Sequence, residues 1–194
     1  MPSVKVGPEF FAKARNDYRD WRWALIREFA QNSIDAGCSK LTFAITLEEN
    51  KTTLRVTNDG NPMTQDVLTN KLLSLGSSGK SFANGAVGGF GKAKELLYFT
   101  HLNYHIHSGE NIVNGCGGDY EFAIGEYFEG TESTILINGD HSQELADAVK
   151  RFALYAQCDP DIELITSEGT DLYTPNLKKG APRRELDFGI VYTN

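Results

Sequence analysis

Two polar side chains, one helical turn apart in an apolar stretch, are the first candidates for chemistry. Glu28 and Asn32 are four residues apart, so they project from the same face of the predicted helix. That face also carries Leu25 and Phe29, and a carboxylate or an amide buried there without a partner would cost about 1–3 kcal/mol. A magnesium ion and an attacking water molecule would supply such partners. The alternative is a solvent-exposed pair on the helix surface.

A glycine-rich segment is the second candidate. Residues 76–91 contain six glycines and three serines, and a helix-forming stretch follows directly. A glycine loop that leads into a helix exposes backbone N–H groups at the positive end of the helix dipole, which is a site for anions. Lys80, Lys92 and Lys94 add positive charge there. The alternative is a flexible linker.

A dense turn signal closes a predicted strand between these two segments. Residues 58–63 are Asn-Asp-Gly-Asn-Pro-Met, and the first five of these residue types all favour tight turns. Taken alone, the segment is typical of the exit from a hairpin. Its position between the other two segments is what makes it a candidate for a shared site.

In this order, the segments resemble the motifs of the GHKL ATPase superfamily, which includes gyrase, the heat-shock chaperone ATPases, histidine kinases and MutL. The resemblance extends over about residues 18–138, and its lid and boxes are most similar to the chaperone, MutL and MORC-like branches. Five segments carry it: Glu28-x-x-x-Asn32 with Asp35-Ala36 (asparagine box), residues 58–63 (first glycine box), Leu75-Gly76-Ser77-Ser78-Gly79-Lys80 (nucleotide lid), Gly88-x-x-Gly91-x-Ala93 (second glycine box) and Gly130-Thr131 (a late Gly-Thr element).

The resemblance implies a role for each matching residue. Glu28 would be the general base that activates water against the γ-phosphate, and Asn32 would bind Mg²⁺ through its side-chain oxygen. The residues implied at the phosphates are Ser77, Ser78, Lys80, Gly88, Gly89, Phe90, Gly91, Lys92 and Ala93. The residues implied at the base end are Asp35, Ala36, Asn58, Asp59, Gly60, Met63 and Thr131.

The first glycine box departs from the family pattern at two positions. Alignment on Gly60 and Met63 puts Asn58 where the family has an acid that accepts a hydrogen bond from the adenine amino group. An asparagine oxygen accepts the same bond without charge assistance. Asn58 is therefore the predicted base-reading residue and Asp59 is the alternative, while Pro62 replaces the second glycine of the box.

The expected function is magnesium-dependent binding and hydrolysis of ATP, with lid closure that drives conformational change or a nucleotide-dependent homodimer. Family members often receive a phosphate-sensing lysine or arginine from a following domain, and this chain is too short to hold one. Turnover is therefore expected to be slow without a following domain or a protein partner. The alternatives are a histidine-kinase-type phosphotransfer domain and a regulatory module that binds nucleotide without turnover.

Two other sites are disfavoured. Gly79-Lys80-Ser81 imitates a P-loop, but Ser74 stands where a P-loop needs its first glycine, and a predicted helix rather than a strand precedes it. His101, His105 and His107 alternate along a predicted strand and would suit a metal. A solvated strand face is the favoured interpretation.

The periodicities predict an α+β fold. Helical spacing covers residues 8–37, 64–75, a stretch ending near 99, and 142–157. Strands are expected at 41–47 and 54–56 as a hairpin, then at 101–107, 111–115, 120–124, 131–138, 162–165 and 188–192. We expect one domain over residues 1–194, with a nucleotide-binding core at about 8–166 and an extension at about 167–194. The resemblance implies a Bergerat-type two-layer sandwich, with a mixed, mostly antiparallel sheet and helices on one face.

The composition of the chain limits which partners and which compartment are expected. A net charge of −7 and a pI of about 5.1 argue against a broad nucleic-acid surface. No apolar run is long enough to cross a bilayer. Cys38, Cys116 and Cys158 are odd in number and widely spaced, which favours a reducing, cytoplasmic compartment.

Overall fold

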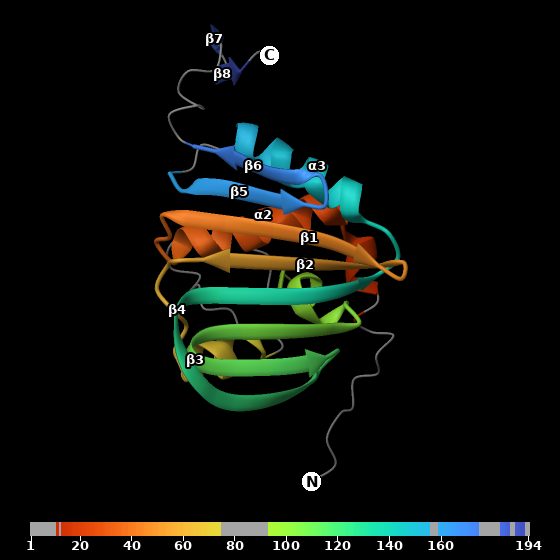
Figure 1. The fold of residues 1–194 in the computed structure, drawn as a ribbon, viewed down its shortest axis with the longest axis vertical. Helices are drawn as coiled ribbons and strands as arrows, with labels where there is room; N and C mark the ends of the chain where they lie inside the picture. The colour runs from red at the N-terminus through yellow and green to blue at the C-terminus, as the bar shows by residue number, and fades with distance from the viewer. Residues whose placement is uncertain are drawn as a thin grey trace.

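The computed structural model describes residues 11, 13–74, 93–155, 159–174, 183–186 and 189–192. Two helices and three short helical turns accompany eight strands over these residues (Figure 1). In chain order they are η1 (Lys13–Asp17), α2 (Trp21–Asp35), β1 (Lys40–Glu48), β2 (Lys51–Asn58), η2 (Val67–Leu72), η4 (Glu95–Phe99), β3 (Asn103–Cys116), β4 (Asp119–Asn138), α3 (Ser142–Tyr155), β5 (Asp161–Thr166), β6 (Gly169–Tyr173), β7 (Arg183–Leu186) and β8 (Gly189–Tyr192).

Six strands form one mixed sheet in the order β3-β4-β2-β1-β5-β6. Only β1 and β5 run parallel, and every other neighbouring pair is antiparallel. Figure 1 shows α2 and α3 together behind this sheet. The predicted α+β class and the two-layer sandwich with a mostly antiparallel sheet are therefore confirmed.

The hairpin of β1 and β2 forms as its alternation predicts. Leu41, Phe43 and Ile45 are buried, and they pair with Asn58, Val56 and Leu54 of β2. The connecting residues Glu49 and Asn50 have φ of 48° and 57°. A two-residue turn with both φ positive is a type I′ turn, whose twist matches that of the flanking strands.

The first helix is shorter than predicted. The periodic pattern over residues 8–37 predicts one helix, but the structure has η1, a break, and then α2 from Trp21. Asp20 accounts for the break, because its side chain accepts a hydrogen bond from the Trp23 N–H at 3.1 Å and caps the new helix. The predicted end at Gly37 is confirmed, with φ of +77°.

The second half of the sheet contains longer strands than predicted. Four short segments merge into β3 and β4, and the register shifts on either side of Gly109 (φ +60°). At this bulge the hairpin curls, so that its outer half turns back beside the start of β3 (Figure 1). β6 and β7 fall between the strands predicted at 162–165 and 188–192, where no strand was predicted.

The core lies between the helices and the sheet. Leu25, Ile26 and Phe29 of α2 and Val149 of α3 are buried against the inward side chains of the strands. Within the described ranges, no helix is long and apolar enough to cross a membrane.

Candidate functional site

Segments far apart in the sequence meet beneath the C-terminal half of α2. Asn58 ends β2 and lies directly opposite Thr131 of β4, and each residue is 9% exposed. Ser33 of α2 is buried at 3% exposure and contacts Asn58 from the helix layer. The α2 segment that carries the asparagine box, the first glycine box and the late Gly-Thr element therefore meet at one buried polar cluster, to which the α2 segment contributes Ser33.

The hydrogen bonds of Asn58 fix the orientation of its amide. The Gly60 N–H only donates, and it bonds to Asn58 Oδ1 at 3.0 Å in an Asx turn. Ser33 Oγ donates to the Phe29 carbonyl at 2.9 Å, so it is an acceptor for Asn58 Nδ2 at 3.1 Å. One lone pair on Oδ1 and one N–H on Nδ2 remain, which suits the donor and acceptor edge of a purine.

Two glycines permit the close approach of these segments. A Cβ on Gly60 would lie 2.9 Å from both Cβ and O of Ala36. A Cβ on Gly130, where φ is +102°, would overlap the carbonyl oxygen of Asn58. The first glycine box is also tied to the end of α2, because the Asn61 N–H donates to the Ala36 carbonyl at 2.8 Å.

Asp59 has a different task from its neighbour Asn58. Its carboxylate accepts hydrogen bonds from the Ser39 and Lys40 backbone N–H groups at 2.8 and 2.9 Å, and from Ser39 Oγ. Burial would raise the pKa of Asp59, but these hydrogen bonds outweigh burial and hold the pKa below its ordinary value. Asp59 therefore anchors the start of β1, and Asn58 is the residue of the pair that faces the cluster.

Sequence reasoning missed Ser108 and Asn111, which attach the hairpin bulge to Met63. The Met63 N–H donates to Ser108 Oγ at 2.7 Å, and Asn111 Nδ2 donates to the Met63 carbonyl at 2.9 Å. Ser108 Oγ also lies 2.7 Å from Thr131 Oγ1. The sequence did carry a signal for Ser108. Every second residue from Tyr104 through Ile106 to Ser108 points inward, and Ser108 is the polar residue in this apolar row.

Glu28 and Asn32 lie on α2 at the border of the buried region. The Glu28 side chain is 24% exposed, and its Oε1 accepts a hydrogen bond from Arg27 Nη2 at 2.7 Å. Asn32 is exposed, so the expectation that it needs a partner to offset burial is wrong. Its amide makes no hydrogen bond to another described residue, which leaves the oxygen open to a cation. A single protein oxygen fits Mg²⁺, which usually keeps several waters.

The other two residues of the asparagine box end the helix. Asp35 is exposed and accepts a hydrogen bond from Gln31 Nε2 at 2.8 Å. Ala36 is half-buried against Gly60. The half-buried Tyr18 lies near Glu28, and burial together with the Glu28 charge raises the pKa of Tyr18.

Most of the predicted phosphate end falls outside the described residues. This applies to Ser77, Ser78, Lys80, Gly88, Gly89, Phe90, Gly91 and Lys92. Ala93, the last residue of the second glycine box, is described and half-buried. The turn η4 follows it and packs against α2, where the Tyr98 and Phe29 rings meet edge to face at 5.9 Å.

Lys94 does not project toward solvent as part of a lysine cluster. It is 5% exposed, and its ammonium donates to the carbonyls of Lys71, at 2.8 Å, and Ser74. Burial lowers the pKa of Lys94, and the charge of Glu95 opposes this. These bonds join the two flanks of residues 75–92.

The three histidines do not share a strand face. His101 precedes β3 and is buried, with Nε2 bonded to the Leu96 carbonyl at 2.7 Å and Nδ1 to Arg15 Nη2 at 3.0 Å. Burial and the neighbouring Arg15 charge lower the pKa of His101 to about 3, so it is neutral. The predicted shared face is wrong for His101, and no group of three or more His, Cys, Asp and Glu suited to a metal occurs among the described residues.

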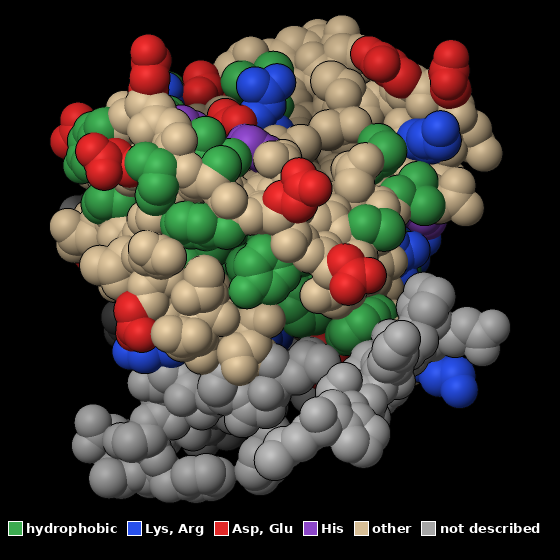
Figure 2. Space-filling model, turned by 90° about the horizontal axis from the view of Figure 1, so that it is seen from below, with side chains coloured by type: hydrophobic (Ala, Val, Ile, Leu, Met, Phe, Trp, Pro, Cys, Tyr) green, Lys and Arg blue, Asp and Glu red, His purple; other side chains and the backbone are tan. Residues whose placement is uncertain are grey.

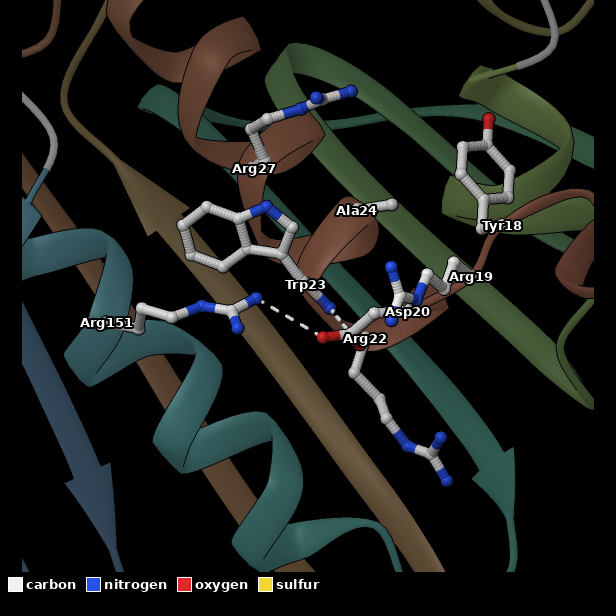
Figure 3. A pocket seen from close by; sticks show the side chains of 8 residues that line it. All are labelled: Tyr18, Arg19, Asp20, Arg22, Trp23, Ala24, Arg27 and Arg151. Atoms are coloured by element: carbon white, nitrogen blue, oxygen red, sulfur yellow. Dashed lines mark hydrogen bonds and ion pairs between the residues drawn. The ribbon is translucent and has the colours of Figure 1, made fainter.

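An open hollow lies elsewhere, at the start of α2 (Figure 3). Its volume is about 670 Å³ and it is open to solvent. Arg151 spans it from α3, with its guanidinium 4.0 Å from the centre of the Trp23 ring and 3.2 Å from Asp20 Oδ2. It contains none of the predicted site residues, and its contacts connect α2 to α3. Tyr18, Arg19, Asp20, Arg22, Trp23, Ala24, Arg27 and Arg151 line it.

No protein-family model and no curated protein matches this chain. The resemblance to the GHKL superfamily therefore rests on the sequence motifs alone.

Proposed function

We propose that this chain binds ATP with magnesium beneath the C-terminal half of α2, in a pocket like that of GHKL ATPases, and hydrolyses it slowly. One observation carries the proposal. Three segments separated by up to 98 positions, from Ser33 to Thr131, meet at one buried polar cluster with two glycines at the contacts. An ordinary helix end and hairpin exit give no reason for this convergence.

In this proposal, the residues of the chain divide the work. Asn58 Oδ1 accepts from the adenine amino group, and Nδ2 donates to a ring nitrogen. Thr131 and Ala36 border the base, while Gly60 and Met63 complete its edge. Asn32 holds the magnesium ion, which offsets phosphate charge when bound. Glu28 orients and deprotonates the attacking water, and catalysis consists of positioning and electrostatics.

Further residues would act on the phosphates. The backbone of residues 88–91 contacts them, with Lys92 and Ala93 at the helix start, and Ser77, Ser78 or Lys80 reach them from the lid. Lid closure then drives a conformational change or a nucleotide-dependent homodimer, and a protein partner or following domain supplies a phosphate-sensing lysine or arginine. We place this activity in the cytoplasm, because the three cysteines are odd in number and widely spaced, which favours a reducing compartment.

A specific contact favours one alternative, a module that binds nucleotide without turnover. The ion pair between Arg27 and Glu28 occupies the carboxylate that would act as base. Hydrolysis then requires the pair to open.

The test is a magnesium-ATP titration combined with a turnover assay. Glu28→Ala should abolish hydrolysis and keep ATP binding, whereas Asn32→Ala should weaken the magnesium-dependent part of binding. Glu168→Ala, an exposed acid in the β5–β6 turn, is the matched control. Turnover at the wild-type rate in Glu28→Ala would refute the general-base role, and ATP binding without turnover in the wild type would support the alternative.

Base recognition is tested separately. ATP should protect the chain against thermal unfolding more than GTP does, and Asn58→Ala should remove the difference. Equal protection by both nucleotides in the wild type would contradict the assignment of Asn58.

A further inference from the structure

The outer half of β4 has a partner strand on one side only, within the described parts of the chain. Residues 119–128 pair with β3, from Asp119 opposite Cys116 to Phe128 opposite Gly109. Pairing of β4 with β2 is confined to residues 131–137. Figure 1 shows residues 119–128 as the outermost strand of the curled hairpin. This stretch therefore presents an open sheet edge, separate from the site proposed for nucleotide.

The hairpin turn determines which backbone groups face this edge. Gly117 and Gly118 form a two-residue loop, and Gly117 has φ of +59°, as the first residue of a type II′ turn requires. The closing pair of Cys116 and Asp119 is then hydrogen-bonded, and the pattern alternates along the strands. Residues 119, 121 and 123 bond to β3. The N–H and C=O groups of residues 120, 122 and 124 point to the open side.

Large apolar side chains accompany these open backbone groups. Tyr120, Ile124 and Tyr127 are 39%, 62% and 64% exposed, and Phe122 between them packs partly against the core. Figure 2 views this side of the molecule and shows apolar side chains interspersed with carboxylates. Three such residues within eight positions of one edge strand are more than scattered surface hydrophobics and mark a contact surface.

The charge of this edge has one sign. No lysine or arginine occurs between Lys94 and Lys150, whereas exposed carboxylates flank the edge. They are Asp119, Glu121, Glu126 and Glu129. Many proteins protect an open edge with lysines. An edge with only acidic charge attracts a basic strand.

A second copy of the chain fits this edge poorly. Antiparallel pairing of residues 119–129 with themselves, in the register centred on Ile124, sets Asp119 opposite Glu129. Like charges directly opposite one another destabilise a strand pair. The charge therefore favours a different partner.

We propose that the outer half of β4 binds an extended segment of a partner protein as an added strand, and that this segment alternates apolar residues with lysine or arginine. Side chains opposite one another in a sheet share a face, and faces alternate along a strand. Apolar residues of the segment would lie beside Tyr120, Phe122 and Ile124, and its basic residues would lie beside Glu121 on the other face. Main-chain hydrogen bonds give affinity in this binding mode, and the side chains give specificity.

The probe is a fluorescein-labelled octapeptide of alternating valine and lysine, measured by fluorescence anisotropy. Ile124→Pro removes an outward N–H and leaves the ladder to β3 intact, so it should weaken binding at least tenfold. Circular dichroism should report an unchanged fold. The same peptide with N-methylated backbone amides should bind at least tenfold more weakly than the parent.

A charge-matched pair of variants decides the case independently of Ile124→Pro. Glu121→Lys should weaken the valine–lysine peptide and strengthen a valine–glutamate peptide. Glu168→Lys makes the same charge change away from this edge and should alter neither. If Glu121→Lys and Glu168→Lys had equal effects, binding would depend on net charge alone, and the proposal would be overturned.

Two further outcomes would also overturn it. One is unchanged peptide binding by a folded Ile124→Pro protein. The other is a wild-type dimer in sedimentation velocity that Ile124→Pro dissociates, because the occupant of the edge would then be a second copy of the chain.

Discussion

The two ends of α2 are attached to the rest of the molecule by different physics. At the start of the helix the contacts are charged and largely exposed: Arg151 with Asp20, and Arg22 with Glu144 at 3.2 Å. At its end they are buried, where Ser33 and Ala36 meet Asn58 and Gly60. Exposed ion pairs contribute little and are screened by salt, whereas buried polar groups are costly once a partner is lost. Substitutions should therefore be tolerated least at the end of α2, which is where we propose that the adenine of ATP binds.

The largest expected effect is at the closest backbone approach of this cluster. Gly130→Ala should lower the free energy of unfolding by about 3 kcal/mol or more, because it combines a strained φ with an overlap on Asn58. Urea denaturation measures the loss. Gly169→Ala is the control, since Gly169 also has a positive φ (+145°) but nothing within 4 Å of an added Cβ. Equal losses in the two variants would mean that the contact with Asn58 contributes nothing.

The second effect concerns the serine that fixes the Asn58 amide. Ser33→Ala leaves Asn58 Nδ2 without its acceptor and should cost about 1–3 kcal/mol. The same variant should lower ATP affinity, because the amide is then free to turn over. Chemical denaturation and a nucleotide titration check the two parts. A stable protein with unchanged ATP and GTP affinities would remove Ser33 from the site.

The third effect depends on pH. The pKa of Asp59 is lower in the folded chain than its ordinary value of 3.8, so its contribution to stability is present above pH 3.8 and is lost as the pH falls through the folded pKa. Asp59→Asn should therefore flatten the acid side of the stability profile and leave its neutral side less stable than the wild type. The stability profiles of the wild type and of Asp59→Asn are measured by thermal unfolding at intervals between pH 2 and pH 7. Parallel profiles for the two proteins would exclude this linkage.

The smallest effect is expected at the start of the helix. Glu144→Ala, which removes the exposed partner of Arg22, should cost less than about 1 kcal/mol, and the difference from wild type should shrink further at high salt. Urea denaturation at two ionic strengths is the measurement. A salt-independent loss larger than that of Ser33→Ala would reverse the comparison between the two ends of α2.

Local patterns predict the parts of this fold whose neighbours lie close in the chain. The β1–β2 hairpin follows from alternation plus a turn at Glu49 and Asn50, and α3 follows from its periodic apolar positions. β6 is different, because its residues are mostly exposed and carry no alternation. Glycines at 109 and 125 interrupt the pattern of β3 and β4, so that two continuous strands look like four segments.

The candidate site was predictable in its order but not in its detail. The spacing of the boxes indicates which segments belong together, and the structure brings Asn58, Gly60 and Thr131 to the end of α2. The contacts of Ser108 with Met63 depend on a bulge and on strand register across 45 positions. His101 was assigned to a strand face because alternation was extended past the true start of β3, while its burial depends on Arg15 and Leu96. No local pattern encodes such distant partners.

The bonds of Lys94 to the carbonyls of Lys71 and Ser74 have a consequence for how this chain can vary. They hold the two described flanks of residues 75–92 beside each other. The entropy of closing a loop between two fixed neighbours rises only slowly with its length. A change in the length of the intervening stretch should therefore cost the sheet and the helices little stability, as long as Lys94 keeps the two flanks together.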